Sequence, residues 1–255
     1  MEKITSRSNP LCTHLRKLSS SASYRRKEGQ FLCDSPKLVA EAIQWRPDLV
    51  RTVVCTADAD LPPLPAGIRA VEVPADIMES VSPAKTPQGV LAVCDIPVQS
   101  LPEKLDGAHY VVLDGVQDPG NVGTILRTGD AFWVDGLFLV NGCADVYGPK
   151  TVRASMGAVF RCPVWSADAE TVSNLLKESG IPLYGAALRE DTLDARDVDY
   201  SRAAVAIGSE GRGLSEEVLA MCDQTIRIPM RERCESLNAA AAATALLWEM
   251  ARGRW

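Results

Sequence analysis

The stretch LDGVQDPGNVGTILR, residues 113–127, has the pattern of a strand end, a loop and a helix, and this unit indicates the fold class. It starts at the end of the apolar run YVVL (110–113), passes through a loop rich in Gly, Pro and Asp, and continues with helical spacing. Asn121 is expected to cap this helix, because an Asn side chain accepts hydrogen bonds from the free N–H groups of a first turn. The apolar stripe of the helix contains Val122, Ile125, Leu126 and Trp133.

The same order of apolar run, loop and helix repeats along the second half of the chain. Further buried strands are expected at 137–140, 182–187, 203–207 and 225–228. Helices are expected near 122–133, 168–179, 214–221 and 236–252. This alternation predicts an α/β fold with a mostly parallel sheet that helices cover on both faces.

The sequence pattern of the first half of the chain predicts a smaller α/β unit. Residues 36–45 have helical spacing, with Ser35 as the cap and Pro36 in the first turn. Short strands are expected at 51–55, 68–73 and 90–94. Residues 96–108 contain prolines and charges without periodicity, which is typical of a linker. We therefore predict a first domain over 1–95, a linker over 96–108 and a second domain over 109–255.

Composition narrows the class of protein. No apolar run reaches the ~18–20 residues of a membrane span, and the N-terminus lacks the apolar segment of a secretory signal, so we expect a cytoplasmic protein. The eight cysteines are at least 12 positions apart, with no CxxC pair, and no metal site is expected. The net charge is −6, yet residues 1–30 alone carry seven bases and two acids. A basic arm on an acidic body suits focused contact with phosphates, although a solvated tail has the same composition.

A glycine-rich loop, AIGSEGRGLS (206–215), follows one of the buried strands. Its spacing is GxxGxG, so it matches neither the GxGxxG of dinucleotide-binding proteins nor the Lys-Ser/Thr pair of a phosphate loop. Further on, IPM (228–230) and SLN (236–238) precede a run of alanines. Ser236 is expected to cap the last helix, and the alanines let it pack very close to its neighbours. Each of these segments is also explained by turns and tight packing alone.

Arg127 is the one charged residue of the 113–127 stretch that a helix would place beside a ligand site. It follows a glycine-rich loop at the carboxyl end of a strand, where α/β sheets bind ligands. The alternative is a surface arginine that pairs with Asp130, three residues further on.

Taken in order, the three segments carry a resemblance that none carries alone. Asn121 to Arg127, GSEGRGLS (208–215) and IPM…SLN (228–238) resemble the three motifs of the SpoU-type RNA ribose methyltransferases of the SPOUT superfamily. The first half is similar to that family's substrate-binding domain in three stretches and a basic helix: ITSRSNPL (4–11), FLCDSPKLVAEAI (31–43) and KTPQGVLAV (85–93). One departure is Asp34-Ser35, where the family usually has Glu-Gly.

The resemblance implies a trefoil-knotted second domain, S-adenosylmethionine as methyl donor, and transfer to a ribose 2′-hydroxyl of RNA. The implied donor-binding residues are Gly208, Gly211, Ile228, Met230, Leu237 and Val140. The implied catalytic residues are Arg127, Asn121, Glu210, Ser236 and Asn238. Arginine is an awkward base, so we expect Arg127 to orient the hydroxyl and a neighbouring phosphate.

RNA contacts are expected in two places. The basic arm offers Arg7, Arg25 and Arg26, and a second basic patch contains Lys150 and Arg153. The resemblance implies a homodimer through the knotted domain, and the separate first domain favours ribosomal over transfer RNA. Two other functions stay open at this point: a non-catalytic RNA-binding protein on the same fold, and a SPOUT enzyme that methylates a base nitrogen.

Overall fold

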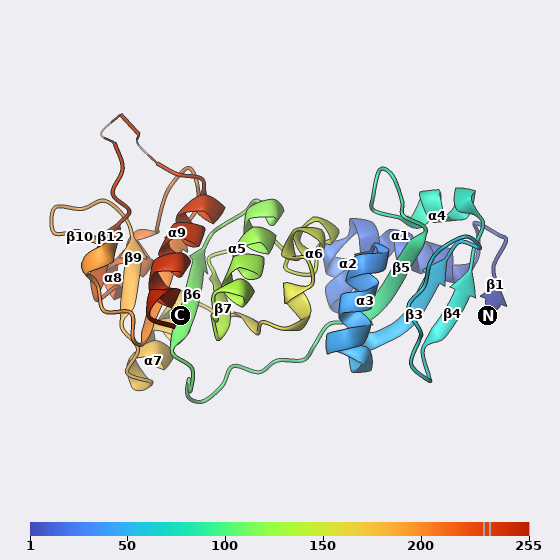
Figure 1. Ribbon diagram of the computed structural model, residues 1–255, viewed down its shortest axis with the longest axis horizontal. Coiled ribbons are helices and arrows are strands. Elements are labelled where there is room, and N and C mark those ends of the chain that lie inside the picture. Colours follow the sequence, from blue (N-terminus) through green and yellow to red (C-terminus); the bar gives the residue numbers. More distant parts are fainter. Residues whose placement is uncertain (232, 235, 255) are drawn as a thin grey trace. The chain divides into compact units, whose positions relative to one another are not determined.

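The computed structural model describes residues 1–231, 233–234 and 236–254. The chain forms two compact units (Figure 1), one from Met1–Val98 with Asp145–Arg161 and the other from Gln99–Ala144 with Cys162–Trp255. The first unit therefore contains a segment, 145–161, from inside the predicted second domain. No helix in the described part of the chain is long and apolar enough to cross a membrane.

The second unit is built on a seven-stranded sheet of the described residues, in which every neighbouring pair of strands is parallel. In spatial order the strands are β10 (Leu193–Asp194), β12 (Gln224–Arg227), β9 (Leu183–Ala186), β11 (Ala203–Gly208), β6 (His109–Asp114), β7 (Gly136–Val140) and β8 (Val164–Ser166). The predicted α/β class with a mostly parallel sheet is confirmed. The strands form where the sequence has short, continuous apolar runs, as expected of strands buried on both faces.

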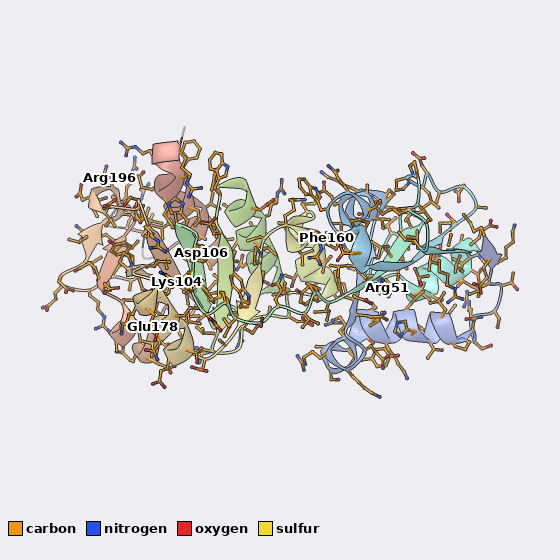
Figure 2. All side chains as sticks on the ribbon, turned by 90° about the horizontal axis from the view of Figure 1, so that it is seen from below. Arg51, Lys104, Asp106, Phe160, Glu178 and Arg196 are labelled. Atoms are coloured by element: carbon orange, nitrogen blue, oxygen red, sulfur yellow. The ribbon has the colours of Figure 1, made fainter. Side chains whose placement is uncertain are left out.

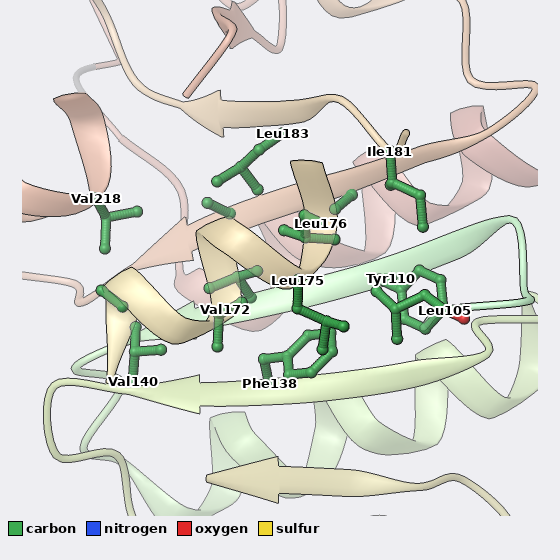
Figure 3. Close-up of a cluster of buried hydrophobic side chains, with 14 of the residues drawn as sticks. Leu105, Tyr110, Phe138, Val140, Val172, Leu175, Leu176, Ile181, Leu183 and Val218 are labelled. Atoms are coloured by element: carbon green, nitrogen blue, oxygen red, sulfur yellow. The ribbon is translucent and has the colours of Figure 1, made fainter. Parts of the chain in front are cut away.

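The helices of this unit are α5 (Pro119–Ala131), α7 (Ala169–Glu178), α8 (Glu216–Met221) and α9 (Ala239–Ala251), with short 3-10 turns at Ala195–Asp197 and Arg252–Arg254. Helix α5 packs against α9, and α7 against α8. Where α7 packs on the sheet, buried side chains from both, such as Leu175 of the helix and Tyr110 and Phe138 of the strands, form one core cluster (Figure 3). Charged side chains such as Lys104, Glu178 and Arg196 are exposed (Figure 2).

Both predicted caps in the catalytic segments were wrong. Helix α5 starts earlier, with Pro119 in its first turn, and the carboxylate of Asp118 accepts a hydrogen bond of 2.8 Å from the backbone N–H of Asn121. Helix α9 is capped by Asn238, whose Oδ1 accepts from the N–H groups of Ala240 and Ala241. The side chain of Asn121 and that of Ser236 are therefore not used as caps.

The predicted apolar stripe of α5 is correct for Val122, Ile125 and Leu126, which are buried. Trp133 is not part of it. The helix ends at Ala131, and Trp133 lies beyond this end with a left-handed backbone (φ 54°) and 44% exposure.

The first unit contains a mixed five-stranded sheet among the described residues, in the order β1 (Glu2–Lys3), β4 (Arg69–Glu72), β3 (Val50–Cys55), β5 (Val90–Asp95) and β2 (Gln30–Asp34). Its helices are α1 (Pro10–Ser20), α2 (Ala22–Glu28), α3 (Pro36–Trp45), α4 (Ala75–Val81) and α6 (Pro149–Ser155), with 3-10 turns at Pro47–Leu49 and Ala158–Phe160. The predicted cap of α3 is confirmed, since Ser35 Oγ accepts a hydrogen bond of 3.2 Å from the N–H of Leu38.

Segment 145–161 is held in the first unit by charge and by aromatic packing. Asp145 Oδ2 accepts hydrogen bonds from Arg25 Nε at 3.0 Å and from Arg25 Nη2 at 2.6 Å. The third contact of this guanidinium is from Nη1 to the carbonyl oxygen of Leu18, at 2.6 Å. The ring of Phe31 packs against that of Tyr147 with centroids 5.0 Å apart. Arg25 is only 5% exposed, so its guanidinium supports the fold.

Replacing Arg25 by Ala should therefore destabilise the protein. The change leaves the Asp145 carboxylate partly buried without its partner, which typically costs about 3–5 kcal/mol. Arg26, the next residue, is exposed, and Arg26→Ala should change the free energy of unfolding by no more than about 0.5 kcal/mol. Urea unfolding of both variants followed by circular dichroism checks the difference, and equal stabilities would contradict the structural role of Arg25.

Candidate functional site

A cavity of about 490 Å³ opens where β9, β11 and β12 end. Its walls come from the ends of these three strands and the residues that follow them, from α8, and from α9 with the residues just before it. The carboxyl ends of parallel strands share one edge of a sheet, and this edge is where open α/β sheets bind ligands. Four of the predicted donor-binding residues line this cavity: Gly208, Ile228, Met230 and Leu237.

Two predicted donor-binding residues lie elsewhere. Val140 is buried in the core cluster at the end of β7, and Gly211 is exposed at the tip of the glycine loop. Neither is among the residues that line the cavity in the described chain.

The glycine loop doubles back on itself directly after β11. Ser209 N–H donates to the Gly213 carbonyl oxygen at 3.1 Å, and Gly213 N–H donates to the Ser209 carbonyl oxygen at 2.8 Å. Gly213 has a left-handed backbone, with φ of 67°. A Cβ atom on Gly208 would lie 2.1 Å from the carbonyl carbon of Gly213, so only glycine fits at this position.

The carboxylate of Asp114, buried at the end of β6, connects the loops of this edge. Its Oδ2 accepts a hydrogen bond of 2.6 Å from the backbone N–H of Ser215, at the end of the glycine loop. Its Oδ1 accepts one of 2.8 Å from Nδ2 of Asn141, which follows β7 with φ of 54°. Ser215 also caps α8, with its Oγ accepting from the N–H of Val218. One side chain thus holds the ends of β6, β7 and β11 in a single arrangement.

Asn121 joins the three segments that the sequence singled out. Its Nδ2 donates to the carboxylate of Glu210, in the glycine loop. Its Oδ1 accepts a hydrogen bond of 3.1 Å from Nδ2 of Asn238, which is also the cap of α9. Glu210 lines the cavity, as does Ser236. A polar chain therefore lies beside the cavity, from Glu210 of the glycine loop through Asn121 of α5 to Asn238 at the start of α9.

Arg127, unlike the other predicted catalytic residues, neither lines the cavity nor belongs to the polar chain beside it. It is exposed on α5 and is not among the residues that line the cavity. In the described part of the chain it forms no hydrogen bond or ion pair, so the alternative pairing with Asp130 is not present. Its guanidinium is available to a ligand or to another chain.

Two partly buried cysteines of the second unit are poor candidates for a base. Cys143 Sγ lies 3.1 Å from the carbonyl oxygen of Leu113, and burial raises the pKa of its thiol to about 11. Burial likewise raises the pKa of Cys222, beside Gly185, to about 11. Both thiols keep their protons at neutral pH.

Sequence reasoning missed the residues that follow β9. Ala187, Leu188 and Arg189 line the cavity next to Ala186, the last residue of the strand, and Arg189 forms an ion pair of 3.1 Å with Glu216. The signal was available, because this strand was predicted and the rule about carboxyl ends applies to it as well. The alanine helix also contributes more than a close-packed face, since Ala239 and Ala242 line the cavity.

The predicted RNA-binding residues all lie in the first unit, and they differ in availability. Arg26 and Lys150 are exposed. Arg7 pairs with Asp76 at 2.8 Å, and Arg153 pairs with the carboxylate of Asp34. The expectation that Arg25 contacts RNA is corrected here, because its side chain is buried and its guanidinium donates hydrogen bonds to Asp145 and to the carbonyl oxygen of Leu18.

Comparison with known families agrees with this geometry. Residues 108–248 match the SpoU rRNA Methylase family, and residues 9–92 match the MRM3-like substrate binding domain. A relative from Bacillus subtilis, 23S rRNA (guanosine(2553)-2'-O)-methyltransferase RlmP, is 33% identical over 98% of this chain and 99% of its own. A second, the 23S rRNA (uridine(2479)-2'-O)-methyltransferase of Streptomyces viridochromogenes, is 34% identical over 84% of this chain and 73% of its own.

Solved structures extend the similarity over the whole chain. An AdoMet-bound rRNA methyltransferase from Sinorhizobium meliloti superimposes with a TM-score of 0.88 at 29% identity, covering 100% of this chain and 98% of the other. The SpoU methyltransferase AviRb from Streptomyces viridochromogenes, in complex with AdoMet, gives 0.84 at 28% identity, with 96% and 98% covered. The chain belongs to the SpoU rRNA methylase family.

Proposed function

We propose that the protein transfers the methyl group of S-adenosylmethionine to a ribose 2′-hydroxyl in ribosomal RNA. The observation that carries this proposal is the polar chain Glu210–Asn121–Asn238, which joins the three family motifs beside one cavity. The two relatives named above are both described as 2′-O-methyltransferases of 23S rRNA, which makes 23S rRNA the first substrate to test.

The cavity fits the proposed donor in size and in chemistry. Its volume of about 490 Å³ is within the ~300–1,000 Å³ typical of small-molecule sites. Ile228, Met230 and Leu237 supply apolar wall, and the side-chain-free Gly208 exposes backbone to the ligand. These four residues would hold S-adenosylmethionine, which when bound supplies a methyl group on a sulfonium centre.

The chain's own residues must orient the 2′-hydroxyl and accept or relay its proton. A hydroxyl is a weak nucleophile, so its lone pair must be aimed and its proton given a route away. Arginine keeps its proton and donates hydrogen bonds, so Arg127 orients the hydroxyl and a neighbouring phosphate. Asn121, Glu210, Ser236 and Asn238 position the site, with the Glu210 carboxylate already accepting a hydrogen bond from Asn121.

We propose a homodimer through the trefoil-knotted second domain, in which the partner completes the site. Support comes from Arg127, which has no partner among the described residues and does not line the cavity of its own chain. A second copy that brings its Arg127 to the cavity would bring all the motif residues together. Because ribosomal RNA is the proposed substrate, we also propose that the protein acts in the cytoplasm.

Ribose-methylation maps of ribosomal RNA from cells with and without the gene test the substrate. One ribose methyl group should be missing from the 23S rRNA of cells that lack the gene, and it should return when a plasmid copy restores the gene. Identical maps for ribosomal RNA, with a methyl group lost from transfer RNA instead, would contradict the ribosomal assignment.

Arg127→Ala should reduce turnover by about 10²–10⁴-fold, the usual contribution of a group that handles the reacting proton or hydroxyl. Binding of S-adenosylmethionine, measured by titration calorimetry, should be unchanged, because the proposed partner of Arg127 is the RNA hydroxyl and phosphate and the donor is held by the cavity residues, which do not include Arg127 of the same chain. Full activity of the variant would remove Arg127 from the mechanism.

Gly208→Ala should abolish donor binding, because the new Cβ atom would overlap the Gly213 backbone and force the loop out of place. The matched control is Gly211→Ala, in the same loop, where a Cβ atom meets no atom within 4 Å. This variant should bind the donor as the wild type does. Equal affinities for both variants would contradict the loop geometry.

Mixing the two inactive variants tests the shared site. In a heterodimer of Arg127→Ala and Gly208→Ala chains, one cavity is intact and receives an intact Arg127 from the other chain. The mixture, unfolded and refolded together, should recover activity that neither variant has alone. A mixture as inactive as its components would place Arg127 in its own chain's site.

A further inference from the structure

A second cavity, of about 450 Å³, lies in the first unit. Its walls come from the start of α3, from the loop between α4 and β5, and from the end of α6. All of its lining residues belong to the unit formed by 1–98 and 145–161. It contains Asp34 and Ser35, where the sequence departs from the Glu-Gly that is usual in the family.

Asp34 is the unusual group in this cavity. Its side chain is only 4% exposed, and one of its two carboxylate oxygens, Oδ2, accepts from the guanidinium of Arg153. The other, Oδ1, is buried and has no hydrogen-bond partner in the described structure. A buried acceptor without a donor is costly, and more so when it is charged. Burial raises the pKa of this carboxyl, while Arg153 opposes the shift.

The rest of the cavity is cationic at its rim and apolar inside. Lys37 and Lys85 line it and are exposed, and neither has an ion-pair partner among the described residues. Leu38 and Val90 are buried where they meet the cavity. The cavity therefore offers cations for a phosphate, an apolar wall for a flat ring and a buried acceptor for an N–H group.

We propose that this cavity binds one unpaired nucleotide of the RNA substrate, with the Watson–Crick edge of its base donating an N–H to Asp34 and its phosphate on Lys37 and Lys85. The identity of the partner rests on the function proposed above. Sequence-specific proteins read unpaired RNA bases by hydrogen bonds to this edge and by packing on their faces. The volume is in the range of a site for one such group.

The charges favour a nucleotide over an acidic peptide. A peptide carboxylate that entered far enough to fill the cavity would meet the carboxylate of Asp34. A nucleotide instead keeps its negative charge at the rim, beside the lysines, and presents neutral N–H donors to the interior.

Two small probes separate the base from the phosphate. Guanosine 5′-monophosphate carries two adjacent N–H donor groups on its base edge, whereas ribose 5-phosphate has the same phosphate and no base. Amide chemical shifts of the full-length protein, titrated with each probe, should move at Ser35, Lys37 and Thr86, which line the cavity. The guanosine nucleotide should bind about tenfold or more tightly than ribose 5-phosphate, as one hydrogen bond to a charged acceptor provides.

Two sets of variants assign the contacts. Asp34→Asn should remove the preference for the guanosine nucleotide and leave ribose 5-phosphate binding unchanged. Lys37→Gln with Lys85→Gln should weaken the binding of both probes. Because the two lysines share one phosphate, the double variant should also lower the slope of log K against log salt for 23S rRNA binding by about 0.7, the value for one phosphate contact of single-stranded RNA. Lys104→Gln with Lys177→Gln, two exposed lysines of the second unit, should leave both measurements unchanged.

Equal binding of the two probes by the wild type, or shifts confined to other residues, would overturn the proposal. The lysine pair does not contact Asp34 in any hydrogen bond or ion pair of the described structure, so it remains informative if Asp34→Asn fails to fold. Both titrations are made without S-adenosylmethionine. A protein that binds the nucleotide here but methylates no RNA would disprove only the proposed function, and an active enzyme that binds no nucleotide here would disprove only this inference.

Discussion

The carboxylate of Asp114 is the constraint on which the site depends. It is buried at the end of a central strand and accepts hydrogen bonds from the N–H of Ser215 and the side chain of Asn141. A buried carboxylate must be satisfied by donors, and here the donors belong to the loops after β11 and β7, the two strands that flank β6. In the arrangement that satisfies Asp114, the glycine loop also places Glu210 within hydrogen-bonding reach of Asn121.

The parallel sheet brings the loops that Asp114 connects to the same place as the other parts of the site. Its strands end at a common edge, so loops far apart in the sequence converge there. Asn238 both caps α9 and donates to Asn121, and this couples the position of the C-terminal helix to that of α5. The tight turn of the glycine loop is possible because Gly208 has no side chain, since a Cβ atom there would lie 2.1 Å from the carbonyl carbon of Gly213.

Much of the fold was predictable because buried parallel strands are short apolar runs. The run AAVAI at 203–207 became β11, extended by one residue. Caps were less predictable, since several residues near each helix start are able to accept the same N–H groups. Pro119 in the first turn of α5 pointed to Asp118 as the cap, and this signal outweighs the suitability of Asn121. Residues 145–161 could not be assigned from local pattern, because the contact between Arg25 and Asp145 spans 120 positions.

The site shows the same division between local and long-range information. The order of the motifs identified Gly208, Ile228 and Leu237 before their cavity was known. Charge alone did not distinguish Arg25, which is buried and paired, from its exposed neighbour Arg26. The unpartnered oxygen of Asp34 was equally beyond a sequence argument, since it depends on Arg153 using the other oxygen of the same carboxylate.

The proposed reaction places a methyl group on a ribose oxygen of RNA. The most direct measurement incubates the purified protein with unmodified 23S rRNA and S-adenosylmethionine carrying a ¹³C-methyl group, and then identifies the labelled nucleoside by digestion and mass spectrometry. We expect the label to stay on the ribose when the base is cleaved from the nucleoside. Label on the released base, or no label in RNA at all, would contradict it.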